Sequence, residues 1–255
     1  LHVSAPWVVD ATGRRALIAS HYGAAGNRDD ALVAFCVVMP AAGGRADART
    51  FIESGEEGWW YSALLPGGKR MLAFFTDDDL AAAAEIADAA GFTRRVTATH
   101  HVRRTVGELP PAAIDRVRRF PAGSVSRRAF GGAGWIAVGD ATIAFDPLSS
   151  QGIFHALYTG LRGAQTALAA MAGDATALPA WHERLRAIHA AYRRHRAQCY
   201  AAETRWPDAP FWQRRQPATR AESAATANPA PLAAGFDRQQ DNLSPRVHVP
   251  TGPLP

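Results

Sequence analysis

The sequence is poor in lysine, cysteine and long apolar runs. Lys69 is the only lysine among 28 basic residues, so arginine carries the net charge of +5. The two cysteines, Cys36 and Cys199, are too few and too far apart for a disulfide framework or a zinc knuckle. No stretch reaches the ~18 consecutive apolar residues that a membrane span requires. We therefore expect a cytoplasmic protein without a membrane span.

Two classes of function are disfavoured by what else is missing. The arginines are spread along the chain and no helix-turn-helix or RNP strand is present, so we expect no nucleic-acid partner. His182 and His189 are seven residues apart on a helical stretch, but no further ligands stand out, and we predict no metal site. The 255 residues are 47% hydrophobic, which indicates a globular chain with a sizeable core.

The most informative stretch covers residues 135–165. Residues 135–138 form a short apolar run that predicts a buried strand, and Asp140 follows where ligands sit in open α/β sheets. Pro147 fixes a turn, and Gly152 opens a predicted helix. Small residues recur at every fourth position of that helix, which predicts a face in close contact with another backbone: Gly152, Ala156, Gly160 and Ala164.

The chemistry of this stretch suits a sugar-phosphate ligand. A carboxylate at a strand end can accept hydrogen bonds from hydroxyl groups, and a helix N-terminus offers free N–H groups and partial positive charge to an anion. The alternative is that Asp140 caps a turn and Gly152 only permits tight packing. The residues alone leave both interpretations open.

Two segments resemble a known family. Residues 139–153, GDATIAFDPLSSQGI, resemble the second flavin-binding motif of FAD-dependent monooxygenases of the hydroxylase type and of their relatives, the flavin-dependent halogenases and the halogenase-like flavoproteins that modify partner enzymes. Residues 8–14, VVDATGR, resemble a strand-end segment of the same FAD domain. The resemblance implies FAD as the cofactor. It implies these cofactor-binding residues: Asp10, Thr12, Gly13, Arg14, Gly139, Asp140, Pro147, Gln151, Gly152 and Ile153.

The fold implied is α/β (α+β): the remainder of a Rossmann-like FAD-binding domain, an inserted antiparallel-sheet substrate domain and a long C-terminal helix. The family's G-x-G-x-x-G turn is not found, so we interpret the chain as the C-terminal portion of a longer flavoprotein. The predicted divisions are FAD-binding segments at 1–20 and 120–175, the substrate domain at 21–119, a helix and aromatic clamp at 176–215, and a loosely ordered tail at 216–255.

Within the predicted substrate domain, strand-like runs cover residues 31–39, 49–53, 59–65 and 70–76, and Gly67-Gly68 indicates a hairpin turn. Residues 80–90 predict a helix that the acidic triplet 77–79 caps and Gly91 ends. Residues 100–104 are predicted to form a strand.

The candidate substrate and catalytic residues are few. Trp59 and Tyr61 occupy the aromatic positions of the W-x-W-x-I-P signature of halogenases, but Ala63 and Leu64 follow, so the signature is not met and halogenation is disfavoured. Both aromatics are candidate substrate contacts, and alternating sheet packing is the alternative. His155 is the best titratable candidate for catalysis, although a packed core histidine fits the same position.

The resemblance implies an FAD-dependent oxidoreductase, most simply a monooxygenase or halogenase-like flavoprotein. Its substrate would be an aromatic small molecule or a residue of a partner protein, with a separate flavin reductase or NAD(P)H as electron source. One alternative is a prenyl or lipid reductase of the same flavin fold. Another is a non-catalytic fragment that binds a partner through its aromatic C-terminal segment.

Overall fold

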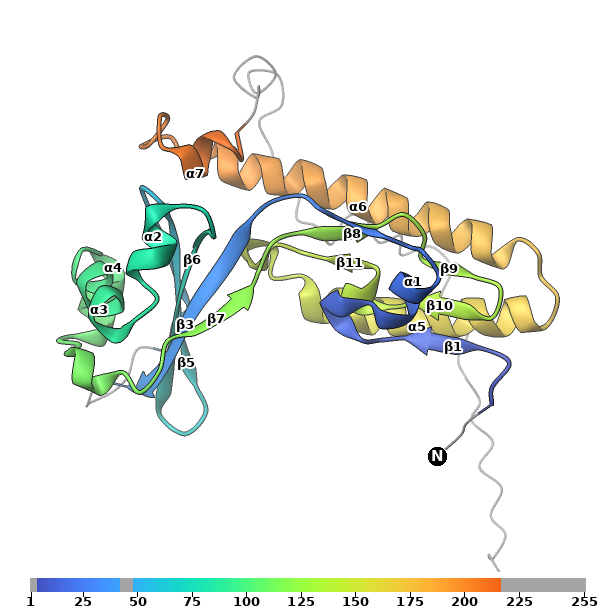
Figure 1. Ribbon diagram of the computed structural model, residues 1–255, viewed down its shortest axis with the longest axis horizontal. Helices are drawn as coiled ribbons and strands as arrows, with labels where there is room; N and C mark the ends of the chain where they lie inside the picture. Colours follow the sequence, from blue (N-terminus) through green and yellow to red (C-terminus); the bar gives the residue numbers. More distant parts are fainter. Residues whose placement is uncertain (1–3, 42–47, 217–255) are drawn as a thin grey trace, which may run out of the picture.

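The computed structural model describes residues 4–41 and 48–216. The predicted tail, except for Gln216, lies outside the described residues. Figure 1 shows a five-stranded sheet with short helices at one end of the molecule and two small sheets beside two long helices at the other. Within the described part of the chain, no helix combines the length and apolarity that crossing a bilayer needs.

The two small sheets bring together strands that are far apart in sequence. The first has the order β1-β10-β9, and β1 and β10 are parallel: β1 (Val8–Asp10), β9 (Gly131–Gly132) and β10 (Trp135–Ala137). The second is antiparallel with the order β11-β8-β2: β2 (Gly26–Arg28), β8 (Val125–Arg127) and β11 (Ile143–Ala144). Short helical segments connect the two sheets: η1 (Gly13–Arg15), α1 (Leu17–His21) and η3 (Gly139–Ala141). A further one, η4 (Pro147–Ser149), follows β11.

The five-stranded sheet is antiparallel with the order β4-β5-β6-β3-β7. Its strands are β3 (Leu32–Pro40), β4 (Phe51–Gly55), β5 (Gly58–Leu65), β6 (Lys69–Asp77) and β7 (Arg118–Pro121). The predicted hairpin is confirmed, because Gly67 and Gly68 join β5 to β6 with φ of 76° and 68°, which glycine adopts without strain. Alternation along β3 sends Val33 to one face and Leu32 to the other.

Short helices cover one face of this sheet: α2 (Ala81–Glu85), α3 (Ala89–Thr97), α4 (His101–Val106) and η2 (Pro111–Ala113). The single helix predicted at 80–90 is wrong. Gly91 lies inside α3, where the Asp88 side chain accepts a hydrogen bond from its N–H, and a Cβ there would be 1.5 Å from the Glu85 carbonyl oxygen. Gly91 thus allows α2 and α3 to meet closely instead of ending a helix.

Two further local predictions are corrected. Residues 101–106 are helical, because the Glu53 carboxylate of β4 accepts hydrogen bonds from the N–H groups of residues 100–102 at 2.6–2.9 Å and so caps α4. The acidic triplet 77–79 does not cap α2, which has no side-chain cap. Its carboxylates instead pair with arginines, among them Arg214 and Arg215.

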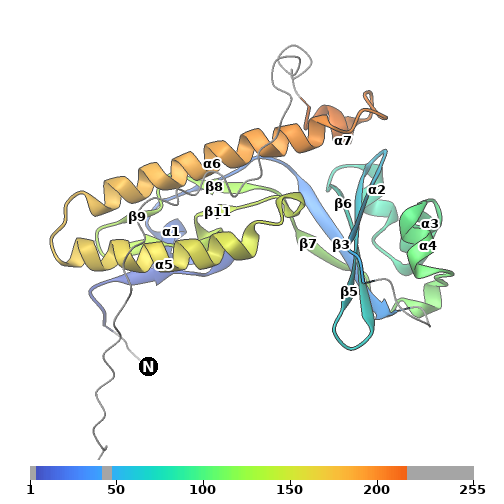
Figure 2. The ribbon, with the colours of Figure 1, turned by 180° about the vertical axis from the view of Figure 1, so that it is seen from behind.

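Two long helices pack side by side, as Figure 2 shows from behind: α5 (Gly152–Met171) and α6 (Ala177–Ala201). The α6 helix continues towards the five-stranded sheet, where α7 (Pro210–Gln213) follows. Phe211 and Trp212 of α7 are buried against the second face of that sheet.

The buried row of α5 differs from the predicted small-residue face. Gly152, Ala156 and Ala164 are exposed, and the buried residues are His155, Thr159, Gly163 and Ala167. A Cβ on Gly163 would lie 2.6 Å from the side chain of Val138, directly after β10, and a Cβ on Gly139 would lie 3.4 Å from Ala156. The close approach of α5 is therefore made mainly by the buried row, and Ala156 of the predicted row contributes to it.

Candidate flavin site

The two motif segments meet at one edge of the first small sheet. Since β1 and β10 are parallel with Asp10 opposite Ala137, the residues after both strands leave at the same edge. The Arg14 Nε lies 3.7 Å from the Asp140 carboxylate. Arg14 also donates hydrogen bonds to the Gly123 and Phe145 carbonyl oxygens. One guanidinium therefore holds both motif segments against the start of the second small sheet.

Asp10 shapes the first of these segments from inside. Its side chain is fully buried, and it accepts hydrogen bonds from the Ala19 N–H at 2.8 Å and from the Thr12 N–H and hydroxyl at 3.0 and 2.6 Å. Burial opposes ionisation, but these hydrogen bonds hold the pKa of Asp10 below its usual value. The carboxylate fixes the turn that carries Gly13 and Arg14.

Asp140 lies at the surface of the site. Its side chain is 35% exposed, and burial raises its pKa, opposed by the positive charge of Arg14. Gly139 precedes it with φ of 58° and donates a hydrogen bond to the Thr159 hydroxyl of α5 at 2.7 Å. A partly exposed carboxylate on a fixed backbone can accept hydrogen bonds from a bound hydroxyl group.

The start of α5 offers an open helix N-terminus beside this carboxylate. No side chain caps α5, Ile153 is 80% exposed, and a Cβ on Gly152 would meet nothing within 4 Å. Ser150, two residues before the helix, has φ of 53°, a left-handed conformation that costs energy in a residue with a Cβ. The N–H groups of the first turn are thus accessible to an anionic ligand. These features fit the dinucleotide-type cofactor that the motifs imply.

The turn before α5 is anchored to α6. Buried Asp146 accepts hydrogen bonds from the Leu148 N–H at 2.9 Å, the Tyr200 hydroxyl at 2.7 Å and the Arg196 Nε at 3.3 Å. Its own N–H donates to the Tyr192 hydroxyl at 2.8 Å. Burial raises the pKa of Asp146, and the bonds from Leu148 and Tyr200 oppose that shift.

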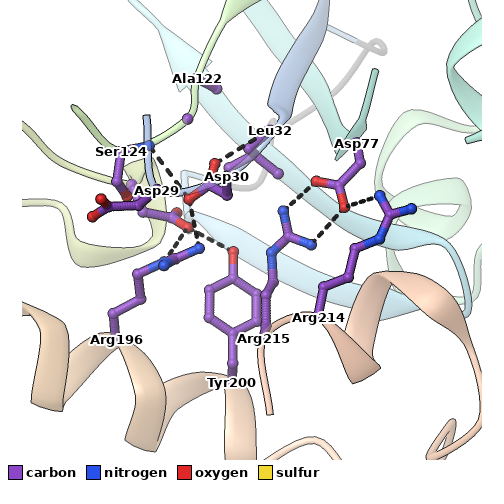
Figure 3. Close-up of polar contacts among 12 residues, drawn as sticks. Asp29, Asp30, Leu32, Asp77, Ala122, Ser124, Arg196, Tyr200, Arg214 and Arg215 are labelled. Atoms are coloured by element: carbon purple, nitrogen blue, oxygen red, sulfur yellow. Dashed lines mark hydrogen bonds and ion pairs between the residues drawn. The ribbon is translucent and has the colours of Figure 1, made fainter. Parts of the chain in front are cut away.

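The same helix and the segment after it reach the five-stranded sheet (Figure 3). Arg196 contacts Asp30 at 2.6 Å, and Arg214 and Arg215 both contact Asp77 at the end of β6. Arg215 and Asp77 side chains are 1% and 2% exposed. The Arg196 side chain is only 17% exposed, so it lies between its two carboxylate partners rather than in solvent. In the sequence, the only sign of these ion pairs was the presence of the acidic residues Asp30 and Asp77 next to strand ends.

The structure places His155 inside the protein. It is 2% exposed, its Nε2 lies 3.0 Å from the Thr142 hydroxyl, and its ring contacts Phe145 at a centroid distance of 4.7 Å. Burial lowers its pKa to about 4, opposed by a hydrogen bond with Gly139. These contacts favour the alternative of a packed core histidine over a catalytic one.

The two candidate substrate residues differ in exposure. Trp59 is 2% exposed, stacks on Phe75 at 3.9 Å and donates from Nε1 to the Tyr200 hydroxyl at 3.2 Å. Its contacts favour the sheet-packing alternative. Tyr61 is partly buried at the edge of the same cluster. It is the one of the pair with surface left for a ligand.

The fold and the adjoining motif segments define an α/β protein with a Rossmann-like cofactor region. The chain belongs to the tryptophan halogenase family, whose sequence model matches residues 2–242. LodB of Marinomonas mediterranea, named as an FAD-dependent oxidoreductase, is 35% identical over 81 residues, which are 32% of this chain and 21% of LodB.

Solved structures confirm the fold. The flavin-dependent halogenase CmlS superposes with a TM-score of 0.72 at 20% identity and covers 86% of this chain. The peptidyl tryptophan dihydroxylase QhpG gives 0.64 at 26% identity over 74% of this chain. The myxobacterial chondrochloren halogenase CndH gives 0.69 at 20% over 86%. The chain spans only 42%, 44% and 53% of these three proteins.

Proposed function

We propose that this chain is part of an FAD-dependent oxidoreductase. The observation that carries the proposal is the parallel pairing of β1 with β10, which brings residues 12–14 beside Asp140 at the same sheet edge. The division into FAD-binding segments, a substrate sheet and a C-terminal helix with an aromatic clamp is part of this proposal.

Each residue of the site has a role in binding or orientation. FAD, when bound, supplies the electron transfer and oxygen chemistry. Asp140 accepts hydrogen bonds from a hydroxyl of the ribityl or ribose group, and the N–H groups of Gly152 and Ile153 stabilise negative charge on the ring. Pro147 and Gln151 line the ring. Asp10, Thr12 and Gly13 act indirectly, because they shape the turn that carries Arg14.

An uncovered apolar surface indicates how the cofactor domain is completed. Val8 and Val9 of the edge strand β1 are 41% and 50% exposed. One side of α5 also exposes large apolar side chains, namely Ile153, Phe154, Leu157, Leu161, Leu168 and Met171. Such a surface is unusual on a monomer. We propose that a strand-turn-helix unit with the dinucleotide fingerprint covers α5 and adds a strand to the free edge of β1, which would continue the parallel pairing of β1 with β10.

The substrate we propose is an aromatic residue of a partner protein, which the enzyme oxygenates. QhpG, a peptidyl tryptophan dihydroxylase, has a similar fold, and the W-x-W-x-I-P signature is not met here. The electrons would come from a separate flavin reductase or from NAD(P)H. A cytoplasmic location stays a prediction from the sequence.

The test is the visible spectrum of the purified natural polypeptide that contains this chain. We expect bound flavin, and Asp140→Ala should weaken FAD binding at least about tenfold because a charge-assisted hydrogen bond is lost. Asp115→Ala, at an exposed loop residue, is the control and should retain the flavin. A colourless protein that does not take up added FAD would refute the proposal.

The reaction type is tested separately, by mass spectrometry of candidate partner peptides after incubation with reduced flavin, oxygen and chloride or bromide. Oxygenation adds mass in steps of oxygen whether or not halide is present. A halide-dependent product would instead establish halogenation.

A further inference from the structure

A large arginine-lined cavity lies between the second small sheet and the five-stranded sheet. Its volume is about 770 Å³, within the range of small-molecule and cofactor sites. The charged residues that line it are Arg14, Arg15, Arg28, Arg119, Arg127 and Asp78. Five guanidinium groups and one carboxylate line the cavity, and although Arg14 is also paired with Asp140 at 3.7 Å, the lining keeps an excess of positive charge.

The single acid is already shared. Asp78 lies 3.9 Å from Arg28 and 3.5 Å from Arg119, and these two arginine side chains are 61% and 57% exposed. Such long, exposed pairs are weak and leave most guanidinium N–H groups to water. A ligand with several anionic oxygens could replace that water with paired, charge-assisted hydrogen bonds.

Arg127 lies deeper in the cavity wall. Its Nη2 donates to the Arg14 carbonyl oxygen at 2.7 Å, whereas its buried Nε has no hydrogen-bond partner. A Cβ on Gly26 would lie 2.5 Å from the Arg127 guanidinium, so the glycine makes room for it across β2. A buried N–H without a partner is uncommon and costly, so Arg127 is not fully satisfied by its protein contacts.

The cavity is separate from the turn that precedes α5. Val33 lines it, and Val33 points to the sheet face that α2–α4 cover. Leu148 of the turn packs on the opposite face with Leu32 and Ala34. Only Arg14 belongs to both the cavity and the cofactor site.

We propose that this cavity binds a second ligand, of nucleotide size, through a phosphate or pyrophosphate group. The inference goes beyond the proposed flavin function, and binding of the second ligand can be measured without turnover. The compact anionic group would contact Arg28, Arg119 and Arg127, and the rest of the ligand would fill the remaining volume.

The test uses the natural full-length polypeptide with FAD bound and isothermal titration calorimetry with pyrophosphate, ADP and adenosine. We expect pyrophosphate and ADP to bind and adenosine not to bind. The double variant Arg28→Gln/Arg119→Gln should weaken binding at least about tenfold, since two charge-assisted contacts are lost. Asp78→Asn should tighten binding, because it removes the competing carboxylate.

The matched control is Arg94→Gln/Arg186→Gln, which removes the same charge from two exposed residues outside the cavity and should change affinity less than about twofold. The flavin absorbance should be equal in all variants. The proposal is overturned if neither phosphate ligand binds, if adenosine binds as tightly as ADP, or if the control weakens binding as much as the double variant. Loss of FAD from Arg28→Gln/Arg119→Gln would also overturn it, because the phosphate would then be the flavin's own.

Discussion

Tyr200 joins α6 to both the five-stranded sheet and the turn before α5, and its hydroxyl can be removed alone. Tyr200→Phe deletes the donor to Asp146 at 2.7 Å and the acceptor of the Trp59 Nε1 at 3.2 Å. The ring stays in place among Phe211 and Trp212, so little packing is lost. The change therefore isolates two buried hydrogen bonds, one of them to a charged group.

The magnitude follows from what remains. Asp146 keeps Arg196 and the Leu148 N–H, but a lost bond to a buried carboxylate costs about 1.5–3 kcal/mol. The Trp59 N–H is left buried without a partner, at a further cost of about 1–3 kcal/mol. Since one hydroxyl serves both, we expect a total loss of about 3 kcal/mol, which is roughly 6–12 °C in Tm for a chain of this size.

Urea unfolding followed by tryptophan fluorescence measures this loss. Tyr22→Phe is the matched control, because Tyr22 is 56% exposed, and we expect less than about 0.5 kcal/mol there. In the FAD-bound full-length protein, Tyr200→Phe should also weaken flavin binding, as it loosens the turn before α5. A Tyr200→Phe variant as stable as Tyr22→Phe would refute the anchoring role.

Three further predictions concern stability. Gly163→Ala should destabilise by about 1–3 kcal/mol in urea unfolding, because its Cβ would come within 2.6 Å of a valine side chain, whereas Gly160→Ala, with nothing within 4 Å, should be neutral or stabilising. Burial lowers the pKa of His155 from 6.5 to about 4, so between these pH values the unfolded chain binds a proton that the folded chain does not. The free energy of unfolding should therefore fall by about 3 kcal/mol as the pH is lowered from 6.5 to 4, and in His155→Gln this part of the pH dependence should be missing. Asp77→Ala should lower the free energy of unfolding by about 3–5 kcal/mol, because it leaves the buried Arg215 guanidinium without its carboxylate. Asp79→Ala removes an exposed partner of Arg214 and should cost less than about 1 kcal/mol, so equal losses would contradict this reasoning.

Local signals in the sequence were sufficient for the three longest strands of the five-stranded sheet. Residues 31–39, 59–65 and 70–76 are apolar runs bounded by Pro or Gly, and all three are strands. The helices that cover the sheet were harder to predict, because a residue distant in the sequence determines where a helix forms. Residues 101–106 are helical because Glu53, about fifty positions earlier, supplies the cap. No window around those residues contains that information.

The candidate site shows the same division. The motifs at 8–14 and 139–153 predicted neighbouring segments, and the Arg14–Asp140 contact joins them. The ion-paired anchor at Asp77 was missed, because three adjacent acids before an alanine-rich run are also what a helix cap looks like. Telling the two apart requires Arg214 and Arg215, which only the fold brings close.

Backbone strain shows where this fold is held most firmly. Among the described residues, the only non-glycine residues with positive φ are Ala16 and Ser150. Ala16 lies two residues after the motif at 8–14, and Ser150 ends the turn η4 within the motif at 139–153. Such conformations persist only where the surroundings over-determine them. Ser150 closes its turn by donating its N–H to the Pro147 carbonyl oxygen, and Asp146 at the start of that turn is held by Tyr200 of α6. The α6 helix also contacts Asp30, just before β3, through Arg196. The distance between a bound cofactor and the substrate sheet would therefore be set by the C-terminal helix, which carries none of the motif residues.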